Sequence, residues 1–224
     1  MATERGFDAM RLLASGAARQ AKTAIARRMR REAIALVERD RLVVAAYSYR
    51  IVPLESAAGG VLVAGGERLE APRLVPPSGE LTALACGAAT LGAALERRAS
   101  ALFAERSVSL ALALDALGNE LLFALTRRVQ DRMLAEAKRE GLTMAGELRA
   151  GDPGLALDAQ AALLRLAQAE RIGIVLSRGS MMQPLKSVSM LLGVGVALPK
   201  ARWSRCDACP SRERCAVARA DLRP

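Results

Sequence analysis

Apolar residues recur every three or four positions along residues 7–40, which is the spacing that places side chains on one face of an α-helix. Met10, Leu13 and Ala17 follow this period, and the segment contains no proline. Gly16 lowers the helix propensity in the middle of the segment. The pattern predicts a helical N-terminal arm.

This predicted helix also concentrates positive charge in the stretch RQAKTAIARRMRRE. The cations of the stretch are Arg19, Lys22, Arg27, Arg28, Arg30 and Arg31. Such a face is either an ordinary solvated helix surface or a contact for nucleic acid or an acidic protein. The pattern alone favours the solvated surface.

After residue 40 the pattern changes to short apolar runs that predict strands. Residues 41–53 and 59–77 are rich in β-branched and aliphatic residues, and Gly65-Gly66 interrupts the second run as a hairpin turn would. The stretch LTALACGAATLG, residues 81–92, is small and apolar and predicts a buried strand.

Two long helices are predicted within residues 93–141, with Ser107 as N-cap candidate of the second and Gly141 as its stop. The elements expected after them are a glycine-rich loop RAGDPG, a helix in residues 157–170, a short strand in 172–177 and a strand in 188–199. Strands interleaved with long helices indicate a mixed α/β or α+β domain.

The 224 residues suffice for one substantial core. We expect three segments: a basic helical arm (1–40), an α+β domain (41–200) and a cysteine-containing tail (201–224). No uninterrupted apolar run approaches the roughly 20 residues that cross a bilayer as a helix. The opening stretch carries Glu4 and Asp8 and does not resemble a secretory signal. We therefore expect a cytoplasmic protein without membrane association.

The sequence contains no histidine, which disfavours acid/base enzymology and histidine-based metal sites. The formal charge of +10 suggests an anionic partner. Aromatic residues, which stack on the bases of single strands, make up only 3% of the chain. A nucleic-acid-binding module is therefore the weakest of the functional interpretations.

Three of the four cysteines, Cys206, Cys209 and Cys215, are spaced C-x2-C-x5-C near the C-terminus. The first pair can present two thiolates to one soft metal ion. An iron–sulfur cluster or a zinc ion normally takes four ligands, and Cys86 is the only other thiol. The spacing favours a metal site, iron–sulfur before zinc. The alternatives are a reduced thiol loop or a Cys206–Cys209 disulfide, and Cys86 in its apolar run is more typical of a small core residue than of a ligand.

Two polar stretches are candidates for binding a small molecule. In LRAGDPGL, Gly151 and Gly154 would let backbone N–H groups approach a ligand, and Arg149 could pair with a carboxylate. In MMQPLKSVS, residues Lys186, Ser187 and Ser189 could anchor an anion. A connecting loop uses the same residue types, so each stretch also has a purely structural interpretation.

Asp115 and Glu120 lie among apolar residues of the second long helix, in LALALDALGNELLFAL. An unpaired carboxylate is costly to bury. Each acid is therefore expected either at the surface of the helix or in contact with a cationic group.

Taken in order, four stretches resemble the reactivation domain of cobalamin-dependent methionine synthase, and in particular its small stand-alone relatives. These are ATLGAALERRAS, LALDALGNE, the arginine loop with PGL, and IGIVLSRGSMMQPLKSVSMLLGVG. The resemblance covers about residues 45–200, and MMQPLKSVS is its most specific part. It implies a C-shaped α+β domain with a twisted, mainly antiparallel sheet and long flanking helices.

The resemblance also implies a function. That domain binds S-adenosylmethionine and docks on a cobalamin domain, and a flavodoxin-like or ferredoxin-like donor supplies the electron for reductive methylation. By this resemblance we expect a stand-alone, accessory reactivation subunit for a corrinoid protein, with the chemistry residing in the cofactors. The alternative is a metal or iron–sulfur scaffold for a corrinoid protein that has lost S-adenosylmethionine binding.

The loop of that family reads R-x-x-P-G-Y. Here Arg149, Pro153 and Gly154 match it with one extra residue after the arginine, so that Gly151 and Asp152 lie inside the loop, and Leu155 replaces the tyrosine. Glu120 resembles an acidic residue of the family's long helix. The resemblance implies that Glu120 faces the sulfonium or ammonium of the ligand and that Arg149 pairs with its carboxylate.

Overall fold

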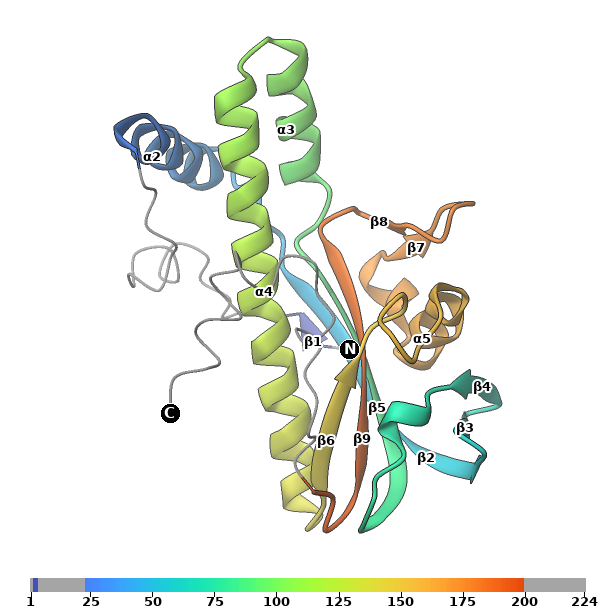
Figure 1. Ribbon diagram of the computed structural model, residues 1–224. Helices are drawn as coiled ribbons and strands as arrows, with labels where there is room; N and C mark the ends of the chain where they lie inside the picture. Colours follow the sequence, from blue (N-terminus) through green and yellow to red (C-terminus); the bar gives the residue numbers. More distant parts are fainter. Residues whose placement is uncertain (1, 4–22, 200–224) are drawn as a thin grey trace. The chain divides into compact units, whose positions relative to one another are not determined.

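The computed structural model describes residues 2–3 and 23–199, and these form helices, one large sheet and a small hairpin (Figure 1). The strands of the large sheet are β1 (Ala2–Thr3), β2 (Ala46–Ala58), β3 (Val61–Ala64), β4 (Glu67–Glu70), β5 (Glu80–Thr90), β6 (Thr143–Leu148) and β9 (Ser187–Val196). The small hairpin consists of β7 (Val175–Leu176) and β8 (Met182–Gln183).

The α-helices of the described residues are α2 (Ala24–Arg39), α3 (Ala94–Ala104), α4 (Val108–Arg139) and α5 (Gln160–Leu166). Three short 3₁₀ helices accompany them: η1 (Pro72–Leu74), η2 (Leu157–Ala159) and η3 (Ala169–Ile172). The second long helix therefore begins directly after Ser107 and ends two residues before Gly141, as the sequence predicted.

The large sheet has the strand order β4-β3-β2-β5-β9-β6, and β1 pairs with β2. The pairs β1–β2, β2–β3, β3–β4 and β6–β9 are all antiparallel. The predicted α+β class with a mainly antiparallel sheet is thus confirmed. β5 is buried without interruption over residues 83–90 and β9 over residues 187–195, as expected for strands inside the sheet.

One glycine pair sets the register at one edge of the sheet. Gly65 and Gly66 have φ angles of +58° and +74°, the left-handed values that a tight two-residue hairpin turn requires. The turn places Ala64 opposite Glu67 and fixes the pairing of β3 with β4. The hairpin predicted at Gly65-Gly66 is confirmed.

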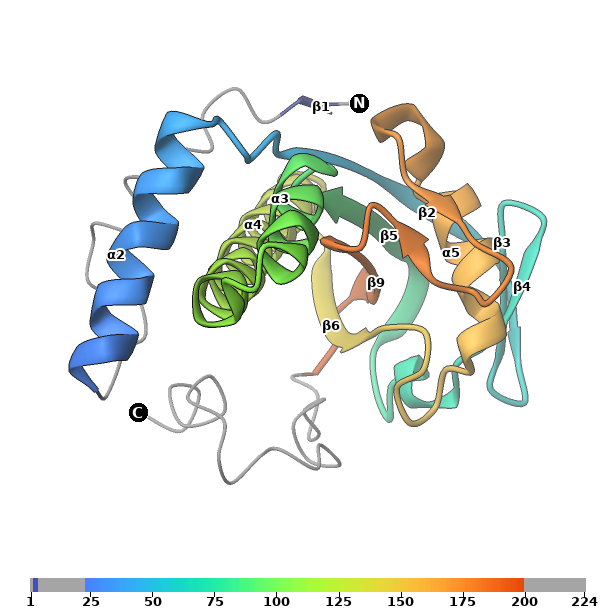
Figure 2. The same ribbon diagram turned by 90° about the horizontal axis from the view of Figure 1, so that it is seen from above.

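The chain divides into two compact units, which we describe separately. The described residues of the first unit are 2–3, 23–49, 88–131 and 168–188. It contains α2, and α3 lies beside the N-terminal half of α4, as both views show (Figures 1 and 2). The first turn of α2 is capped by Thr23, whose Oγ1 accepts a hydrogen bond from Ala26 N over 3.1 Å.

The second unit comprises residues 50–87, 132–167 and, of its last segment, the described residues 189–199. It holds β3, β4, β6 and α5, and α5 lies close to β4 (Figure 2). Arg165 of α5 joins Glu67 of β4 by two bonds, 2.6 Å from Nε to Oε1 and 2.9 Å from Nη2 to Oε2. This pair holds the edge hairpin and the helix together.

Helix α4 carries a buried stripe at helical spacing. Its fully buried or nearly buried residues are Ala111, Leu114, Leu117, Leu121, Leu125, Val129, Met133 and Ala137. Length and composition alone would allow this helix to cross a membrane, but the core helix of a soluble protein passes the same test. The stripe recurs every three or four residues, which is the pattern of a helix packed on a protein core.

The segment boundaries predicted from the sequence stay predictions. The arm expected at residues 1–40 includes α2, whereas residues 4–22 lie outside the described part of the chain. The tail expected at residues 201–224 lies outside it as well.

Candidate functional site

Among the described residues of the first unit, the most enclosed charge is the ammonium of Lys186, which directly precedes β9. Its side chain is only 10% exposed. Nζ lies 2.6 Å from Asp115 Oδ1 and donates to Asn119 Oδ1 over 2.6 Å. Asp115 and Asn119 are four residues apart on α4 and therefore share one face of that helix. The lysine is thus neutralised by an acid whose own side chain is 47% exposed.

Gly118 of α4 leaves room for the side chain of Lys186 against this helix. A Cβ at this position would lie 3.2 Å from Lys186 Cε and 2.9 Å from Leu95 Cδ2, closer than such contacts normally come. A helix interior disfavours glycine by about 1 kcal/mol relative to alanine. The glycine therefore lets Lys186 and Leu95 of α3 approach the helix axis.

The backbone around Lys186 is fixed by the end of β5. The carbonyl oxygen of Lys186 accepts bonds from Leu91 N over 3.0 Å and from Thr90 Oγ1 over 3.4 Å. Ser187 Oγ donates to Thr90 Oγ1 over 2.9 Å, and both side chains are buried. Ser187 thus serves this internal network.

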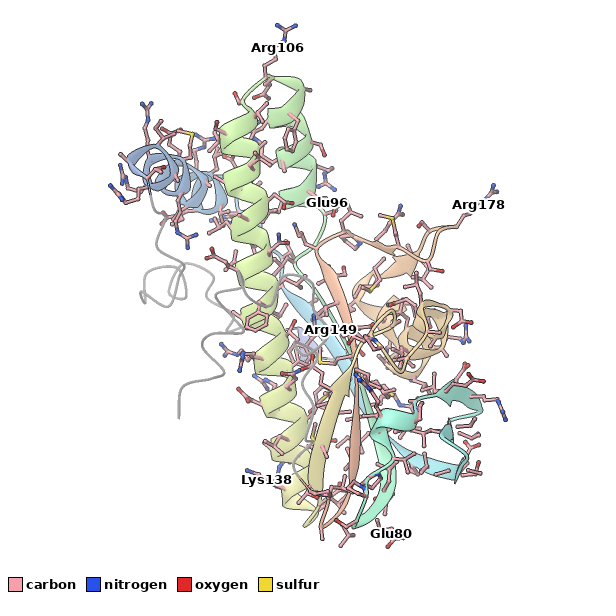
Figure 3. All side chains as sticks on the ribbon, viewed as in Figure 1. Glu80, Glu96, Arg106, Lys138, Arg149 and Arg178 are labelled. Atoms are coloured by element: carbon pink, nitrogen blue, oxygen red, sulfur yellow. The ribbon has the colours of Figure 1, made fainter. Side chains whose placement is uncertain are left out.

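Glu120 does bind a cation, and the cation comes from the N-terminal arm. Arg30 of α2 donates from Nη1 to Oε1 over 2.9 Å and from Nη2 to Oε2 over 2.7 Å, a bidentate pair. The two side chains are 18% and 28% exposed. In α3, the carboxylate of Glu96 (labelled in Figure 3) accepts a hydrogen bond from the backbone N–H of Leu185, next to Lys186.

In the second unit, Arg149 lies where the chain leaves β6 (Figure 3). Its Nε and Nη2 donate to Glu147 Oε1 over 3.2 and 3.0 Å. The backbone N–H of Arg149 donates to Asp152 Oδ2 over 2.8 Å, and Asp152 N donates back to the carbonyl of Arg149 over 2.9 Å. Asp152 therefore closes the loop that Arg149 opens.

The two glycines of this loop act in its own folding. Gly151 N donates to the carbonyl of Leu155 over 2.9 Å, so this donor is already used. Gly154 has a φ angle of +93°, and a Cβ there would lie 2.9 Å from Arg73 Cδ. Pro153 lies between Asp152 and Gly154, and Leu155, which replaces the tyrosine of the family loop, is buried in the core.

Ser189 belongs to a separate buried contact of the second unit. Gln160 Nε2, at the start of α5, donates to Ser189 Oγ over 3.0 Å. Both residues are buried. The pair joins the loop helix α5 to β9.

Cys86 is fully buried in β5, and burial raises the pKa of its thiol to about 12. A neutral thiol is a poor metal ligand, so the environment supports the interpretation of Cys86 as a core residue. Within the described ranges, no group of three or more cysteine, aspartate or glutamate side chains could hold a metal ion. Cys206, Cys209 and Cys215 lie outside those ranges, and their metal site stays a prediction.

The predicted ligand residues therefore fall into two groups. Glu120, Lys186 and Ser187 belong to the first unit, and Arg149 to Gly154 together with Ser189 belong to the second. Sequence reasoning missed the partners of these residues, which are Arg30, Thr90, Asn119, Glu147 and Gln160. Of these partners, Glu147 could have been inferred for Arg149, because the two residues are two positions apart and side chains with this spacing in an extended segment point to the same face.

No protein-family model matches this sequence, and no curated protein matches it. Solved structures do. A crystal structure of the MetH reactivation domain bound to AdoHcy matches with a TM-score of 0.59 and 14% sequence identity, covering 80% of this chain and 67% of that one. At this identity the match concerns the fold, and it confirms the resemblance at that level. The chain has the fold of the methionine synthase reactivation domain.

Proposed function

We propose that this chain binds S-adenosylmethionine and supports the reductive methylation of a corrinoid protein as a stand-alone reactivation subunit. The single observation that carries the proposal is the similarity of fold, over 80% of the chain, to a reactivation domain bound to AdoHcy. The stretches of sequence that resemble that family lie within the described residues 23–199.

Arg149 is the residue proposed to bind the carboxylate of the ligand. It is 24% exposed at the end of β6, and Glu147 and Asp152 fix its side chain and its backbone. Guanidinium groups pair with carboxylates through parallel, charge-assisted hydrogen bonds. In the same unit, Ser189 would support the site through its hydrogen bond with Gln160.

Isothermal titration with S-adenosylmethionine and AdoHcy tests the ligand half of the proposal. Arg149→Met should weaken binding at least about tenfold, the effect of losing one charge-assisted hydrogen bond. Arg165→Met is the matched control, because Arg165 is also an arginine of the second unit paired with a glutamate. No binding by the wild type up to millimolar ligand, or equal losses in the two variants, would contradict the assignment.

The second half of the proposal concerns the partners, which are a corrinoid protein and an electron donor. An excess of positive charge on this chain would favour association with an acidic, flavodoxin-like or ferredoxin-like donor. Sedimentation velocity with a purified cobalamin-binding protein measures docking directly. The reaction is measured by the return of the methylcobalamin absorbance. This return should require this chain, a reductant and S-adenosylmethionine.

A second candidate is a scaffold for a corrinoid protein that no longer binds S-adenosylmethionine. Buried Leu155 and the internal bond of Gly151 N favour it, because neither is offered to a ligand. It predicts docking on the corrinoid protein that does not depend on S-adenosylmethionine. Iron, zinc and acid-labile sulfide analysis of protein purified without oxygen tests whether Cys206, Cys209 and Cys215 bind a metal in either case.

A further inference from the structure

Helix α2 carries its arginines at the end where positive charge is least favourable. Arg27, Arg28, Arg30 and Arg31 fall in the first half of this 16-residue helix, and its first turn contains no acid. The N-terminus of a helix carries a partial positive charge, which favours acids there and disfavours cations. Like charges three or four residues apart also repel each other along a helix face. The arrangement therefore costs the isolated helix stability.

Contacts within the protein offset only part of this cost. Arg30 forms the bidentate pair with Glu120 of α4. Arg28 pairs with Glu32 of its own helix over 2.8 Å, although its side chain is 72% exposed. Arg31 is exposed, and its guanidinium has no hydrogen-bond or ion-pair partner among the described residues. The fold alone thus gives no reason for the charge of Arg31.

The outer side of α2 carries an arginine face, formed by Arg27, Arg28 and Arg31. Their spacings of one, three and four residues place them on one side of the helix, within about 6 Å along its axis. All three are exposed, and no described helix or strand of the first unit lies beyond α2 in either view (Figures 1 and 2). The cap from Thr23 holds this end in helical geometry, so the face is formed before a partner binds.

The apolar side of α2 argues against a membrane surface as the partner. Its buried residues, Ala33, Leu36 and Val37, are already packed inside the protein. Ile25, three residues before Arg28, is 72% exposed. A helix that lies on a bilayer needs a broad apolar face to insert. One isoleucine does not provide that face, but it suffices for a local contact in a protein interface.

Acids confine the positive charge to a compact patch. Glu32 is 40% exposed, and exposed Glu38 lies two turns after Arg31 on the same side of the helix. Duplex DNA carries one negative charge per about 1.7 Å of its axis, and such an extended array would meet these acids as well as the arginines. A localised cluster of acids on a protein matches the size of the patch better.

We propose that the arginine face of α2, with Ile25 at its border, docks on an acidic surface of a partner protein. Arginine is enriched in protein interfaces, and an apolar side chain beside the charges adds contact area. Docking supplies the carboxylates that the first half of the helix lacks. The proposed function assigns no contact to this face, and the docking does not depend on S-adenosylmethionine.

Biolayer interferometry on the full chain tests the docking. The probes are a purified flavodoxin and poly-L-glutamate as acidic polypeptides, a short DNA duplex, and vesicles that contain phosphatidylserine. The double variant Arg28→Gln with Arg31→Gln should bind the acidic polypeptides about tenfold more weakly at low salt, mainly through slower association. The difference should shrink at high salt, because ions screen exposed charges.

The double variant Arg97→Gln with Arg106→Gln is the matched control. Both residues are exposed arginines of the same unit, on α3 and directly after it, and Arg106 is labelled in Figure 3. The control loses the same charge and should bind almost as the wild type does. Ile25→Ser should weaken binding about fivefold at low and at high salt, because the contact it removes is apolar.

Urea denaturation separates weaker binding from unfolding. Because Arg31 has no partner among the described residues and the Arg28–Glu32 pair is exposed, the variant of the arginine face should unfold at nearly the wild-type urea concentration. A residue set with a purely structural role would lower this midpoint instead.

Three results would overturn the proposal. The first is an equal loss in the arginine-face variant and in the control, which would indicate an effect of net charge alone. The second is tighter binding of the duplex or the vesicles than of either acidic polypeptide. The third is a wild type that binds neither acidic polypeptide at low salt. Titration with S-adenosylmethionine tests the proposed function separately, so either idea can fail without the other.

Discussion

Removing Asp115 should destabilise the protein more than removing its partner Lys186. The ammonium of Lys186 is 10% exposed and has two oxygen neighbours at 2.6 Å, from Asp115 and Asn119. Asp115→Ala leaves that enclosed positive charge with the neutral Asn119 alone. Lys186→Met removes the enclosed charge, keeps most of the stem that packs against Gly118, and leaves Asp115, which is 47% exposed, to be hydrated.

The magnitudes follow from these exposures. Breaking a fully buried ion pair from one side costs about 3–5 kcal/mol, whereas an exposed pair contributes about 0.2–1 kcal/mol. With one partner enclosed and the other half exposed, we expect Asp115→Ala to cost about 2 kcal/mol, between these limits. We expect Lys186→Met to cost about 1 kcal/mol or less, and the double variant to be more stable than Asp115→Ala alone.

Urea denaturation followed by circular dichroism measures the free energies of unfolding. For a chain of this size, 2 kcal/mol corresponds to a melting temperature lower by roughly 4–8 °C. Asp131→Ala on the same helix is the control for loss of an exposed acid and for the gain in helix propensity, and should stay within about 0.5 kcal/mol of the wild type. A cost of Lys186→Met equal to or larger than that of Asp115→Ala would refute the reasoning.

Two further predictions concern ionisable groups. Burial raises the pKa of the Cys86 thiol to about 12. Iodoacetamide at about pH 8 should therefore leave the Cys86 peptide unmodified in the native protein and alkylate it in urea, which peptide mass spectrometry measures. Rapid alkylation of the native protein would contradict the burial of Cys86. The hydrogen bond from Arg165 lowers the pKa of Glu67 below its ordinary 4.5, so the pair stabilises the fold above that value and loses its effect as the pH falls through the lowered pKa. Glu67→Gln should therefore have a lower free energy of unfolding than the wild type at neutral pH, and the difference should vanish in acid. Urea titrations at several pH values measure it, and a difference that grows in acid would contradict the lowered pKa of Glu67.

Local patterns in the sequence predicted much of the fold because they reflect local geometry. Gly65 and Gly66 marked a hairpin, and Ser107 and Gly141 marked the limits of α4, because turns and helix ends depend on a few neighbouring residues. The order of strands in the sheet is different. The neighbours of β5 are β2 and β9, and no local pattern specifies pairing over such sequence separations.

The candidate site shows the same limit. The sequence identified Glu120, Arg149 and Lys186 as charged residues that need partners. Glu147 could have been inferred for Arg149 from strand periodicity. Arg30 could not, because it lies 90 residues from Glu120 and looks like any other arginine of a basic helix. Long-range ion pairs are selected by tertiary packing, which a single sequence does not display.

In the DALGNE stretch of α4, tertiary packing supplies the partner of each charge. Each of its two acids pairs with a cation from a different segment: Asp115 with Lys186, just before β9, and Glu120 with Arg30 of α2. Gly118 lies between the two acids and leaves room for the lysine, at a cost of about 1 kcal/mol of helix propensity. Alanine at position 118 would recover this helix propensity only if its neighbours moved, because its Cβ would lie 2.9 Å from Leu95 Cδ2 and 3.2 Å from Lys186 Cε.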